Sequence, residues 1–299
     1  MHRVLVNNPA SGNRQLTTQA REIALDQEYE IHDTTKPRDA FELARRAVLE
    51  EANVVVACGG DGTVNEVVRG VDAERGLATS RLGVIPTGTG NGFAKDIGIT
   101  TIQDAFDVLD SEQVRSLDLG TANNHLFLKT CVSGFPATLS AHTTHEMKHF
   151  FGIAAYGLGA IPSALDALHG LGADSLPALR VRVGSSDNPI WTGTAVMVLT
   201  GNSRRFPGVI SRQASMEDGL LEVVVVKRPS VLRTLRRAEP SATKFDTPYL
   251  LRVQTSELEI EAPVPTLFSL DGELIKRKHL TIGVLPQSVQ FYVGDHYQP

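Results

Sequence analysis

Cysteine is scarce in this chain, and long hydrophobic runs are missing. Its two cysteines, Cys58 and Cys131, stand far apart in apolar stretches, which excludes a disulfide scaffold and favours reduced thiols in the cytoplasm. The longest nearly apolar run, residues 150–161, contains three glycines and is too short to span a bilayer. The N-terminus becomes polar too early for a signal peptide. The sequence predicts a soluble cytoplasmic protein whose only membrane contact is peripheral, at the inner face.

A strong excess of charge is also missing. The net charge is −5 and charged residues make up 21% of the chain, so nothing draws the whole molecule to nucleic acid, which is not an expected partner. Membrane contact would need a local basic patch, and one set of cations could either supply it or be a solvated face: Lys227, Arg228, Arg233, Arg236 and Arg237. The 299 residues, 41% of them hydrophobic, suffice for two domains with separate cores.

The first part of the chain alternates strands and helices. Apolar runs predict strands at residues 4–8, 31–34, 53–57 and 82–85. Helical spacing predicts helices at residues 15–25, 39–51 and 64–70, the second beginning with a capping box of Asp39 and Glu42. Single helices between strands imply parallel pairing in an α/β layer fold.

The pattern changes near residue 118, after which short strands dominate. They are predicted at residues 126–129, 179–183, 194–200, 220–226, 250–254, 258–260, 280–282 and 289–293, with a helical segment at 141–169. Turn residues between these strands indicate an antiparallel sandwich. We therefore expect an α/β domain at residues 1–118 and a β-rich domain at residues 119–286, with residues 287–299 packing back on the first.

The most informative segment follows the third strand and opens a helix. Residues 58–66 read CGGDGTVNE, so three glycines surround Asp61. Glycine has no Cβ, which allows sharp turns and lets backbone N–H groups approach a phosphate closely. The helix N-terminus adds unbonded N–H groups and the positive end of the helix dipole. The segment predicts a phosphate-binding turn; a tight strand-to-helix turn without a ligand is the alternative.

Two more glycine-bearing turns end other strands of the same predicted sheet. Residues 8–12 read NPASG, and residues 86–94 read PTGTGNGFA. The carboxyl ends of parallel strands meet at one edge of an open sheet, where such sheets bind ligands. Three turns of this kind at one edge are a stronger indication than any one alone.

Together the three turns resemble the catalytic domain of the diacylglycerol kinase family, which includes sphingosine and ceramide kinases and bacterial lipid kinases. The family pattern is NPxxG, then GGDGTxNE, then PxGTxNDFA, and this chain has all three in order, with Gly92 replacing the usual Asp. The resemblance continues with DGLLEV at residues 218–223 and LDGE at residues 270–273, so it covers nearly the whole chain. The GGDGT segment alone is shared with NAD kinases and phosphofructokinases.

The resemblance implies an ATP-dependent lipid kinase. It implies a Rossmann-like α/β nucleotide-binding domain, as in NAD kinases and phosphofructokinases, followed by a C-terminal antiparallel β-sandwich domain that receives a lipid at the membrane surface. The residues implied to surround the nucleotide are Asn8, Pro9, Ala10, Ser11, Gly12, Thr34, Gly59, Gly60, Asp61, Gly62, Thr63, Val64, Asn65 and Thr89. For Thr34, a plain turn hydroxyl is an equally good interpretation.

The resemblance also implies magnesium. Mg²⁺ prefers hard oxygen ligands and keeps several waters, so one carboxylate with carbonyl oxygens can hold it. Asp218 would supply the carboxylate, with mainly backbone oxygens from Ser215 and Leu220, at a site that is either structural or catalytic. Without a metal, Asp218 and the glycine after it would form an ordinary hairpin turn. A further magnesium would arrive with ATP, near Asp61.

A lipid hydroxyl is a weak nucleophile, so transfer to it needs a base. Asp271 and Glu273 are the candidates that match the family, with Glu273 slightly favoured because a carboxylate within reach can accept the proton. By itself, an Asp-Gly turn at this position would be unremarkable.

Two other functions would produce a similar sequence. An NAD kinase-like phosphotransferase shares the GGDGT turn, but its downstream Asn-Glu pair and second threonine- or serine-rich loop have no convincing counterpart here. A nucleotide- or lipid-binding regulator with weak or lost catalysis would keep every turn, and only turnover would separate it. The sequence leaves open which lipid is the acceptor, the choice of ATP or GTP, and the oligomeric state, for which a homodimer is one expectation.

Overall fold

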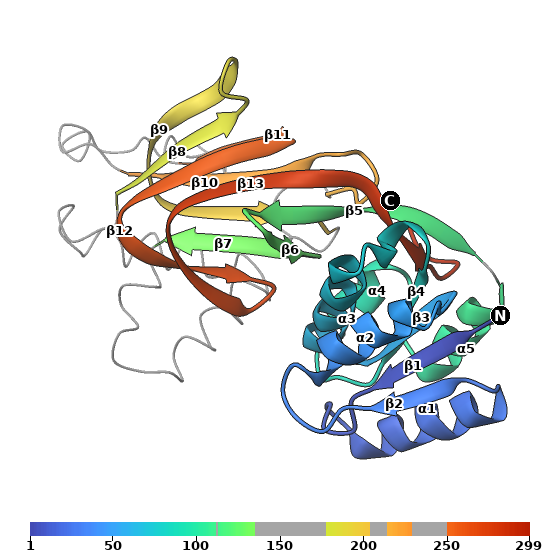
Figure 1. Cartoon of the computed structure of the whole chain (residues 1–299). Coiled ribbons are helices and arrows are strands. Elements are labelled where there is room, and N and C mark those ends of the chain that lie inside the picture. The colour runs from blue at the N-terminus through green and yellow to red at the C-terminus, as the bar shows by residue number, and fades with distance from the viewer. Residues whose placement is uncertain (112, 135–177, 204–213, 229–249) are drawn as a thin grey trace, which may run out of the picture. The chain divides into compact units, whose positions relative to one another are not determined.

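The computed structural model describes the chain apart from residues 112, 135–177, 204–213 and 229–249 (Figure 1). The predicted helix at residues 141–169 and three cations of the predicted basic patch lie outside the described residues. The chain divides into two compact units, the first comprising Met1–Leu119, Met216–Asp218 and Leu285–Pro299, and the second Gly120–Ser215 and Gly219–Val284. Two strands run from one unit into the other: β5 (Val114–Ala122) and β13 (Glu273–Tyr292).

The first unit contains a parallel sheet. Its strands are β1 (Arg3–Asn7), β2 (Glu30–Asp33), β3 (Val54–Gly59) and β4 (Arg81–Pro86), in the order β2-β1-β3-β4. The end of β13 joins β4 in parallel through Gln290 and Phe291. Every residue of β3 is buried, because helices lie on both faces of the sheet (Figure 1). This explains why β3 is an unbroken apolar run rather than an alternating one.

Five α-helices accompany this sheet: α1 (Arg14–Asp26), α2 (Asp39–Leu49), α3 (Asp61–Ala73), α4 (Gly92–Asp96) and α5 (Ile102–Ser111). A 3₁₀ turn at Gly76–Ala78 follows α3. The sequence predicted the first three, but α3 begins three residues earlier than expected, inside the glycine-rich turn. The predicted capping box of α2 is wrong: Arg38 is the N-cap and forms no side-chain cap bond. The Asp39 carboxylate instead accepts bonds from Thr35 and Lys36 in the preceding turn.

The order of the strands locates the place where a ligand can enter. From β1 the chain moves outward to β2, then crosses back to β3 on the other side of β1. The connections that leave β1 and β3 therefore diverge to opposite sides, which opens a crevice at the carboxyl ends of these two strands. The first two glycine-bearing turns follow these strands, and the third follows β4, the neighbour of β3.

The second unit is built from antiparallel pairs. Its strands are β6 (His125–Phe127), β7 (Thr130–Gly134), β8 (Leu179–Gly184), β9 (Pro189–Gly201), β10 (Leu221–Lys227), β11 (Leu250–Thr255) and β12 (Glu257–Leu270). They follow the order β11-β10-β9-β7-β12-β13, and β8 pairs with both β9 and β12. The two strands predicted at residues 280–282 and 289–293 are parts of the single long strand β13.

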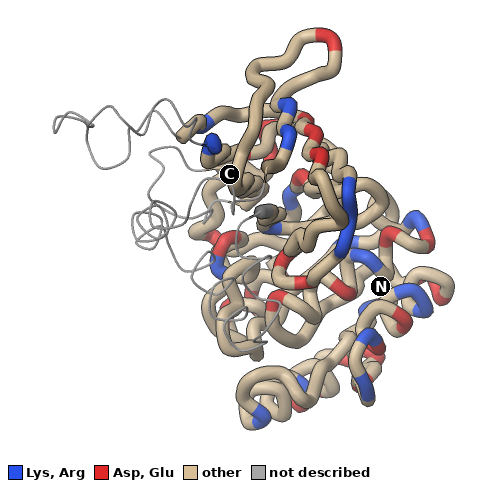
Figure 2. The backbone as a smooth tube through the Cα atoms, turned by 90° about the vertical axis from the view of Figure 1, so that its left-hand side faces the viewer, with Lys and Arg blue, Asp and Glu red and all other residues tan. Residues whose placement is uncertain are grey.

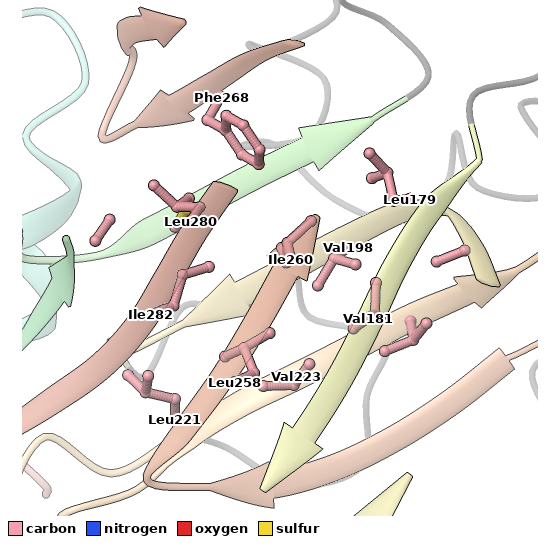
Figure 3. Close-up of a cluster of buried hydrophobic side chains, with 14 of the residues drawn as sticks. Leu179, Val181, Val198, Leu221, Val223, Leu258, Ile260, Phe268, Leu280 and Ile282 are labelled. Carbon is pink, nitrogen blue, oxygen red and sulfur yellow. The ribbon is translucent and has the colours of Figure 1, made fainter. Parts of the chain in front are cut away.

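The core of the second unit lies between these strands (Figure 3). Leu221, Val223 and Val225 of β10 point into the larger apolar cluster, which also contains Leu258 and Ile282. The intervening residues of β10, Val224 and Val226, join a second and smaller cluster with members of β7 and β9. Because both faces of β10 are covered, its sequence is almost continuously apolar. Among the described residues, no helix is long and apolar enough to cross a bilayer.

Candidate active site

Backbone and side-chain hydrogen bonds tie the three glycine-bearing turns of the first unit together. The Asn8 N–H donates to the Cys58 carbonyl oxygen at 2.9 Å, and the Asn8 side-chain amide donates to the Thr63 hydroxyl at 3.0 Å. The Thr87 N–H donates to the Gly59 carbonyl oxygen at 3.2 Å, while the Thr87 carbonyl accepts from Asn13 at 3.3 Å. The convergence predicted from strand order is therefore present in the structure.

Glycines allow the three turns to touch. A Cβ placed on Gly60 would lie 3.3 Å from the Cα of Gly88, and one placed on Gly88 would lie 2.9 Å from the Gly60 nitrogen. Gly12 has a φ of +48°, and a Cβ there would lie 2.9 Å from the Cα of Gly88. Backbone packing alone requires glycine at positions 12 and 88, and it leaves a side chain at position 60 in tight contact with Gly88. Gly88 belongs to the PTGTGNGFA segment but was not predicted as a site residue, although the threonines on either side of it were a usable signal.

Gly62 is a glycine of another kind. It is exposed in the first turn of α3, its φ is not positive, and a Cβ on it would meet no atom within 4 Å. Gly60, the N-cap of α3, has no side chain to cap the first N–H groups of the helix. Nothing in the described part of the chain requires glycine at position 62, whereas close approach of a phosphate to the helix N-terminus would. The three turns therefore fit a polyphosphate.

Asp61 fastens the third turn to the second. Its carboxylate accepts bonds from the N–H groups of Gly92 at 3.0 Å and Phe93 at 2.8 Å, the first two residues of α4. A carboxylate has about four acceptor sites, so these bonds leave capacity for a metal ion. Asp61 thus has a structural role in holding α4, and its catalytic role stays a prediction.

The remaining nucleotide-site candidates fall into two groups. Thr63, Val64 and Asn65 are buried in α3, where they hold the helix against its neighbours. The others lie at least partly exposed in turns at the strand ends: Pro9, Ala10, Ser11, Thr34 and Thr89. The Thr34 N–H donates to the Asn7 carbonyl oxygen at 2.8 Å, which places Thr34 beside the first turn. Cys58 is buried, which raises the pKa of its thiol to about 12 and keeps it un-ionised.

The loop with the predicted magnesium ligands, residues 215–220, is fixed by hydrogen bonds to its central residues. The Arg115 guanidinium donates to both oxygens of Glu217, at 3.0 and 2.6 Å, and lowers the pKa of that carboxyl. The Asp118 N–H donates to the Met216 carbonyl oxygen at 2.7 Å. These bonds explain why Met216–Asp218 group with the first unit, which the sequence did not anticipate.

Within that loop, Asp218 is exposed, and Ser215 and Leu220 are half-buried. Gly219 has a φ of +70°, so Asp218 and Gly219 do form a bend before β10. The exposed carboxylate and nearby backbone oxygens are hard donors that suit Mg²⁺. The magnesium site stays a prediction.

The two candidate bases of the second unit differ sharply. Asp271 lies in the two-residue turn between β12 and β13, with a φ of +48°. Its carboxylate accepts three backbone N–H bonds: Leu128 at 2.6 Å, Thr130 at 2.8 Å and Lys129 at 2.9 Å. Burial raises the pKa of this carboxyl, and the three bonds oppose that effect. Asp271 therefore holds the β6–β7 connection in place.

Glu273 is the first residue of β13 and is exposed. It lies opposite Leu270, the last residue of β12, directly after the turn. An exposed carboxylate can approach a substrate hydroxyl, whereas the Asp271 carboxylate is enclosed by amides. Of the two, Glu273 is the more accessible carboxylate, and its role as the base stays a prediction.

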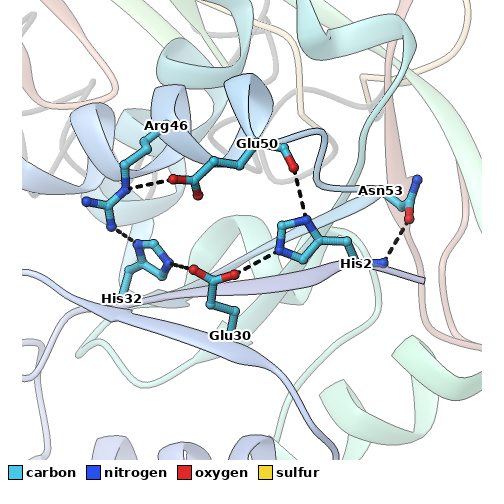
Figure 4. Close-up of polar contacts among 6 residues, drawn as sticks. All are labelled: His2, Glu30, His32, Arg46, Glu50 and Asn53. Atoms are coloured by element: carbon cyan, nitrogen blue, oxygen red, sulfur yellow. Dashed lines mark hydrogen bonds and ion pairs between the residues drawn. The ribbon is translucent and has the colours of Figure 1, made fainter.

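One further polar cluster joins β1, β2 and α2 (Figure 4). Glu30, His32 and Glu50 place ligand atoms within 4.8 Å of one another, the one such metal-ligand group among the described residues. The Arg46 guanidinium contacts Nδ1 of His32. Because arginine only donates, Nδ1 accepts and Nε2 donates to Glu30, at 2.6 Å. Because the Arg46 cation already contacts His32, we interpret the cluster as an ion-pair network rather than as a metal site.

The comparisons with known proteins agree with this geometry. Residues 2–122 match the diacylglycerol kinase catalytic domain. A protein named probable lipid kinase YegS-like from Pectobacterium atrosepticum is 29% identical over 292 residues, covering 96% of this chain and 93% of that protein. A similarly named protein from Pseudomonas aeruginosa is 29% identical over 269 residues, covering 89% of this chain and 85% of that protein. These matches support a kinase role.

Solved structures show the fold. A diacylglycerol kinase structure from Bacillus anthracis superposes with a TM-score of 0.71 at 18% identity, covering 99% of this chain and 98% of that one. Yeast NADH kinase complexed with NADH gives a TM-score of 0.52 at 10% identity, covering 99% and 84%. At such identities the likeness shows the fold alone, which is mixed α/β with many strands, as predicted. The resemblance drawn from the three turns is confirmed: residues 2–122 of this chain match the diacylglycerol kinase catalytic domain, and the relatives similar over most of the chain are named probable lipid kinases.

Proposed function

We propose that the protein is an ATP-dependent lipid kinase that phosphorylates a lipid hydroxyl, such as that of diacylglycerol, to give a phospholipid. The observation that carries this proposal is the convergence of three glycine-bearing turns at the crevice of the first unit, with open space beside Gly62. That arrangement suits a triphosphate, because backbone N–H groups can approach it without side chains in the way. The named relatives add the lipid as the class of acceptor.

In this proposal the two units divide the work. The Rossmann-like first unit holds ATP, and the antiparallel second unit, whose strands we propose to form a sandwich, receives the lipid at the inner face of the membrane. The acceptor hydroxyl oxygen attacks the γ-phosphorus and forms a new O–P bond. The bond from the γ-phosphorus to the bridging oxygen breaks, and ADP leaves with that oxygen.

The residues of the chain contribute position and one proton transfer. The turns at Gly12, Gly60 and Gly88 fix the phosphates, and Asp61 fixes the third turn. Glu273 accepts the hydroxyl proton as the attack proceeds. Mg²⁺, when bound, offsets phosphate charge; Asp218, with Ser215 and Leu220, and Asp61 are the residues that would hold it.

The test offers two acceptors side by side to the purified full chain. Labelled ATP and magnesium are supplied with a total lipid extract in one reaction and with NAD in another. We expect label in a phospholipid and none in NADP, and little label with Glu273→Ala or Asp61→Ala. Label in NADP would identify an NAD kinase. Tight ATP binding without any labelled product would identify a nucleotide-binding regulator, and both outcomes contradict the proposal.

A further inference from the structure

Three consecutive cations stand on β13, close to the proposed base. Lys276, Arg277 and Lys278 are all exposed, on a chain whose net charge is −5. Figure 2 colours lysine and arginine blue and aspartate and glutamate red along the backbone, and the two colours are interspersed over the molecule. Because the chain as a whole is acidic, this local concentration of positive charge needs an explanation of its own.

No acidic side chain faces these cations across the strand pair. Leu267 is opposite Lys276, and Thr266 is opposite Arg277. Within the described part of the chain, no ion pair involves any of the three cations. Arg277 contacts its neighbour's carbonyl oxygen and His125, which does not neutralise it.

The acidic residues of β12 nearest to these cations already form ion pairs with β8. Glu259 pairs with Arg182 at 2.6 Å, and Glu261 pairs with Arg180 at 3.5 Å, both arginines belonging to β8. Among the described residues, no acid of β12 therefore compensates the positive charge of the β13 cations, whose side chains alternate between the two faces of the strand.

Apolar side chains are exposed beside the cations. The register of β12 against β13 shifts between Glu261 and Thr266, so the intervening residues, with the sequence APVP, bulge out opposite Lys278. Val264 in this bulge is 60% exposed, and Leu274 of β13 is 37% exposed. Exposed apolar groups flanked by cations match the interface of a bilayer with anionic lipids, where the apolar groups enter the headgroup layer and the cations meet the phosphates.

We propose that Lys276, Arg277 and Lys278, together with Val264 and Leu274, form a docking surface for an anionic lipid bilayer. This deepens the proposed function, on which it rests in one respect: Glu273 precedes these cations by three residues, so docking there would bring the base to the membrane that contains the acceptor. The same lysines and the prolines of the bulge also protect a strand edge from pairing with another chain. The test below separates the two roles.

The size of the effect follows from surface electrostatics. Each cation near an anionic leaflet strengthens binding about fivefold, so the loss of three should weaken it about 100-fold. Salt should weaken binding of the unaltered protein, because exposed charges are screened over about 10 Å at 0.1 M.

The experiment measures co-sedimentation of the full chain with vesicles, without nucleotide. The vesicles contain phosphatidylcholine alone or phosphatidylcholine with about one third phosphatidylglycerol. The test variant is Lys276→Gln/Arg277→Gln/Lys278→Gln. The matched control removes the same charge from three exposed cations of the first unit, as Lys36→Gln/Arg38→Gln/Arg75→Gln. A third variant, Val264→Ser, tests the apolar part.

We expect the unaltered protein and the control to bind the anionic vesicles and neither to bind phosphatidylcholine alone. The β13 triple variant should lose about 100-fold in binding, and Val264→Ser should lose less. Equal binding by both triple variants would overturn the proposal, as would self-association of the β13 variant with unchanged vesicle binding. Loss of binding to a DNA duplex with vesicle binding intact would assign the cations to nucleic acid instead.

These outcomes are independent of the kinase reaction. If vesicle binding depends on the β13 cations but no lipid is phosphorylated, the docking surface stands and the proposed function fails. If a detergent-dispersed lipid is phosphorylated equally by the unaltered protein and the β13 variant, and vesicle binding is also equal, the function stands and the docking surface fails.

Discussion

Each unit has an Asp-Gly pair at a turn: Asp61-Gly62 in the first and Asp271-Gly272 in the second. The aspartates behave alike, but the glycines do not. In both, the aspartate binds backbone N–H groups: Asp61 takes those of Gly92 and Phe93, and Asp271 takes those of residues 128–130. The glycines differ. Gly272 has a φ of +94°, a conformation that favours glycine, while Gly62 has neither a positive φ nor a close neighbour.

This difference separates a glycine required by the fold from one that only a ligand would require. At Gly272 the backbone conformation of the hairpin demands it, since φ is positive at both turn residues. At Gly62 the protein itself offers room for a side chain. The same dipeptide therefore forms a hairpin in one unit and lies at the proposed phosphate site in the other.

The largest effect should come from Glu273, beside the second pair. Glu273→Gln removes the proposed base and should lower kcat about 10²–10⁴-fold, because the hydroxyl proton loses its acceptor. ATP binding, measured by calorimetry, should not change, since the nucleotide turns are intact. Undiminished kcat would exclude Glu273 as the base.

Asp271→Asn should act on stability. The two carboxylate oxygens of Asp271 both accept backbone N–H bonds, whereas asparagine has one oxygen and one NH₂ group. The NH₂ group would face an N–H donor, so at least one charge-assisted bond is lost within an enclosed site. We expect the free energy of unfolding to fall by about 3 kcal/mol, measured in urea. A variant as stable as the unaltered protein would show that the three bonds do not hold the turn.

The glycines themselves form a matched pair. Gly272→Ala should cost about 1–2 kcal/mol, because alanine is strained at positive φ. Gly62→Ala should instead stabilise the fold by about 0.4–1 kcal/mol through reduced freedom of the unfolded chain. It should still weaken Mg-ATP binding, by about tenfold, since its methyl group occupies the space beside the phosphates. Urea unfolding and calorimetry on both variants check the pair. Unchanged affinity of Gly62→Ala for Mg-ATP would contradict a phosphate site beside Gly62.

The smallest effect concerns Glu30 in the polar cluster of the first unit. Hydrogen bonds from His2 and then His32 lower the pKa of this carboxyl below its ordinary 4.5. A lowered pKa adds stability above the ordinary value that disappears as pH falls through the folded-state pKa. Because Glu30 is half exposed, the effect should stay below about 0.5 kcal/mol. Unfolding curves of the unaltered protein and Glu30→Gln should converge as the pH falls from about 6 to 3; parallel curves would contradict this.

Local pattern was enough to predict much of the first unit. Apolar runs identified β1 to β4, and glycine-rich turns after three of them identified the edge where they meet, because strand direction and order follow from single helical crossovers. It was not enough for the shape of β13, because Gly283 and Pro286, which separate the two predicted strands, lie inside one continuous strand. The local pattern also did not reveal that α2 begins without a capping box, because the Asp39 carboxylate accepts hydrogen bonds from the preceding turn instead.

The sequence by itself determined which chemical groups are present: glycines at the proposed phosphate site, carboxylates near two turns, and a run of cations on an acidic chain. Only the tertiary structure decided how each group is used. Asp271 and Glu273 are two residues apart and both carry a carboxyl group, yet the amides of Leu128 to Thr130, more than a hundred residues away, enclose one and leave the other exposed. A side chain's availability depends on its partners in space, and those are set by folding rather than by the neighbouring sequence.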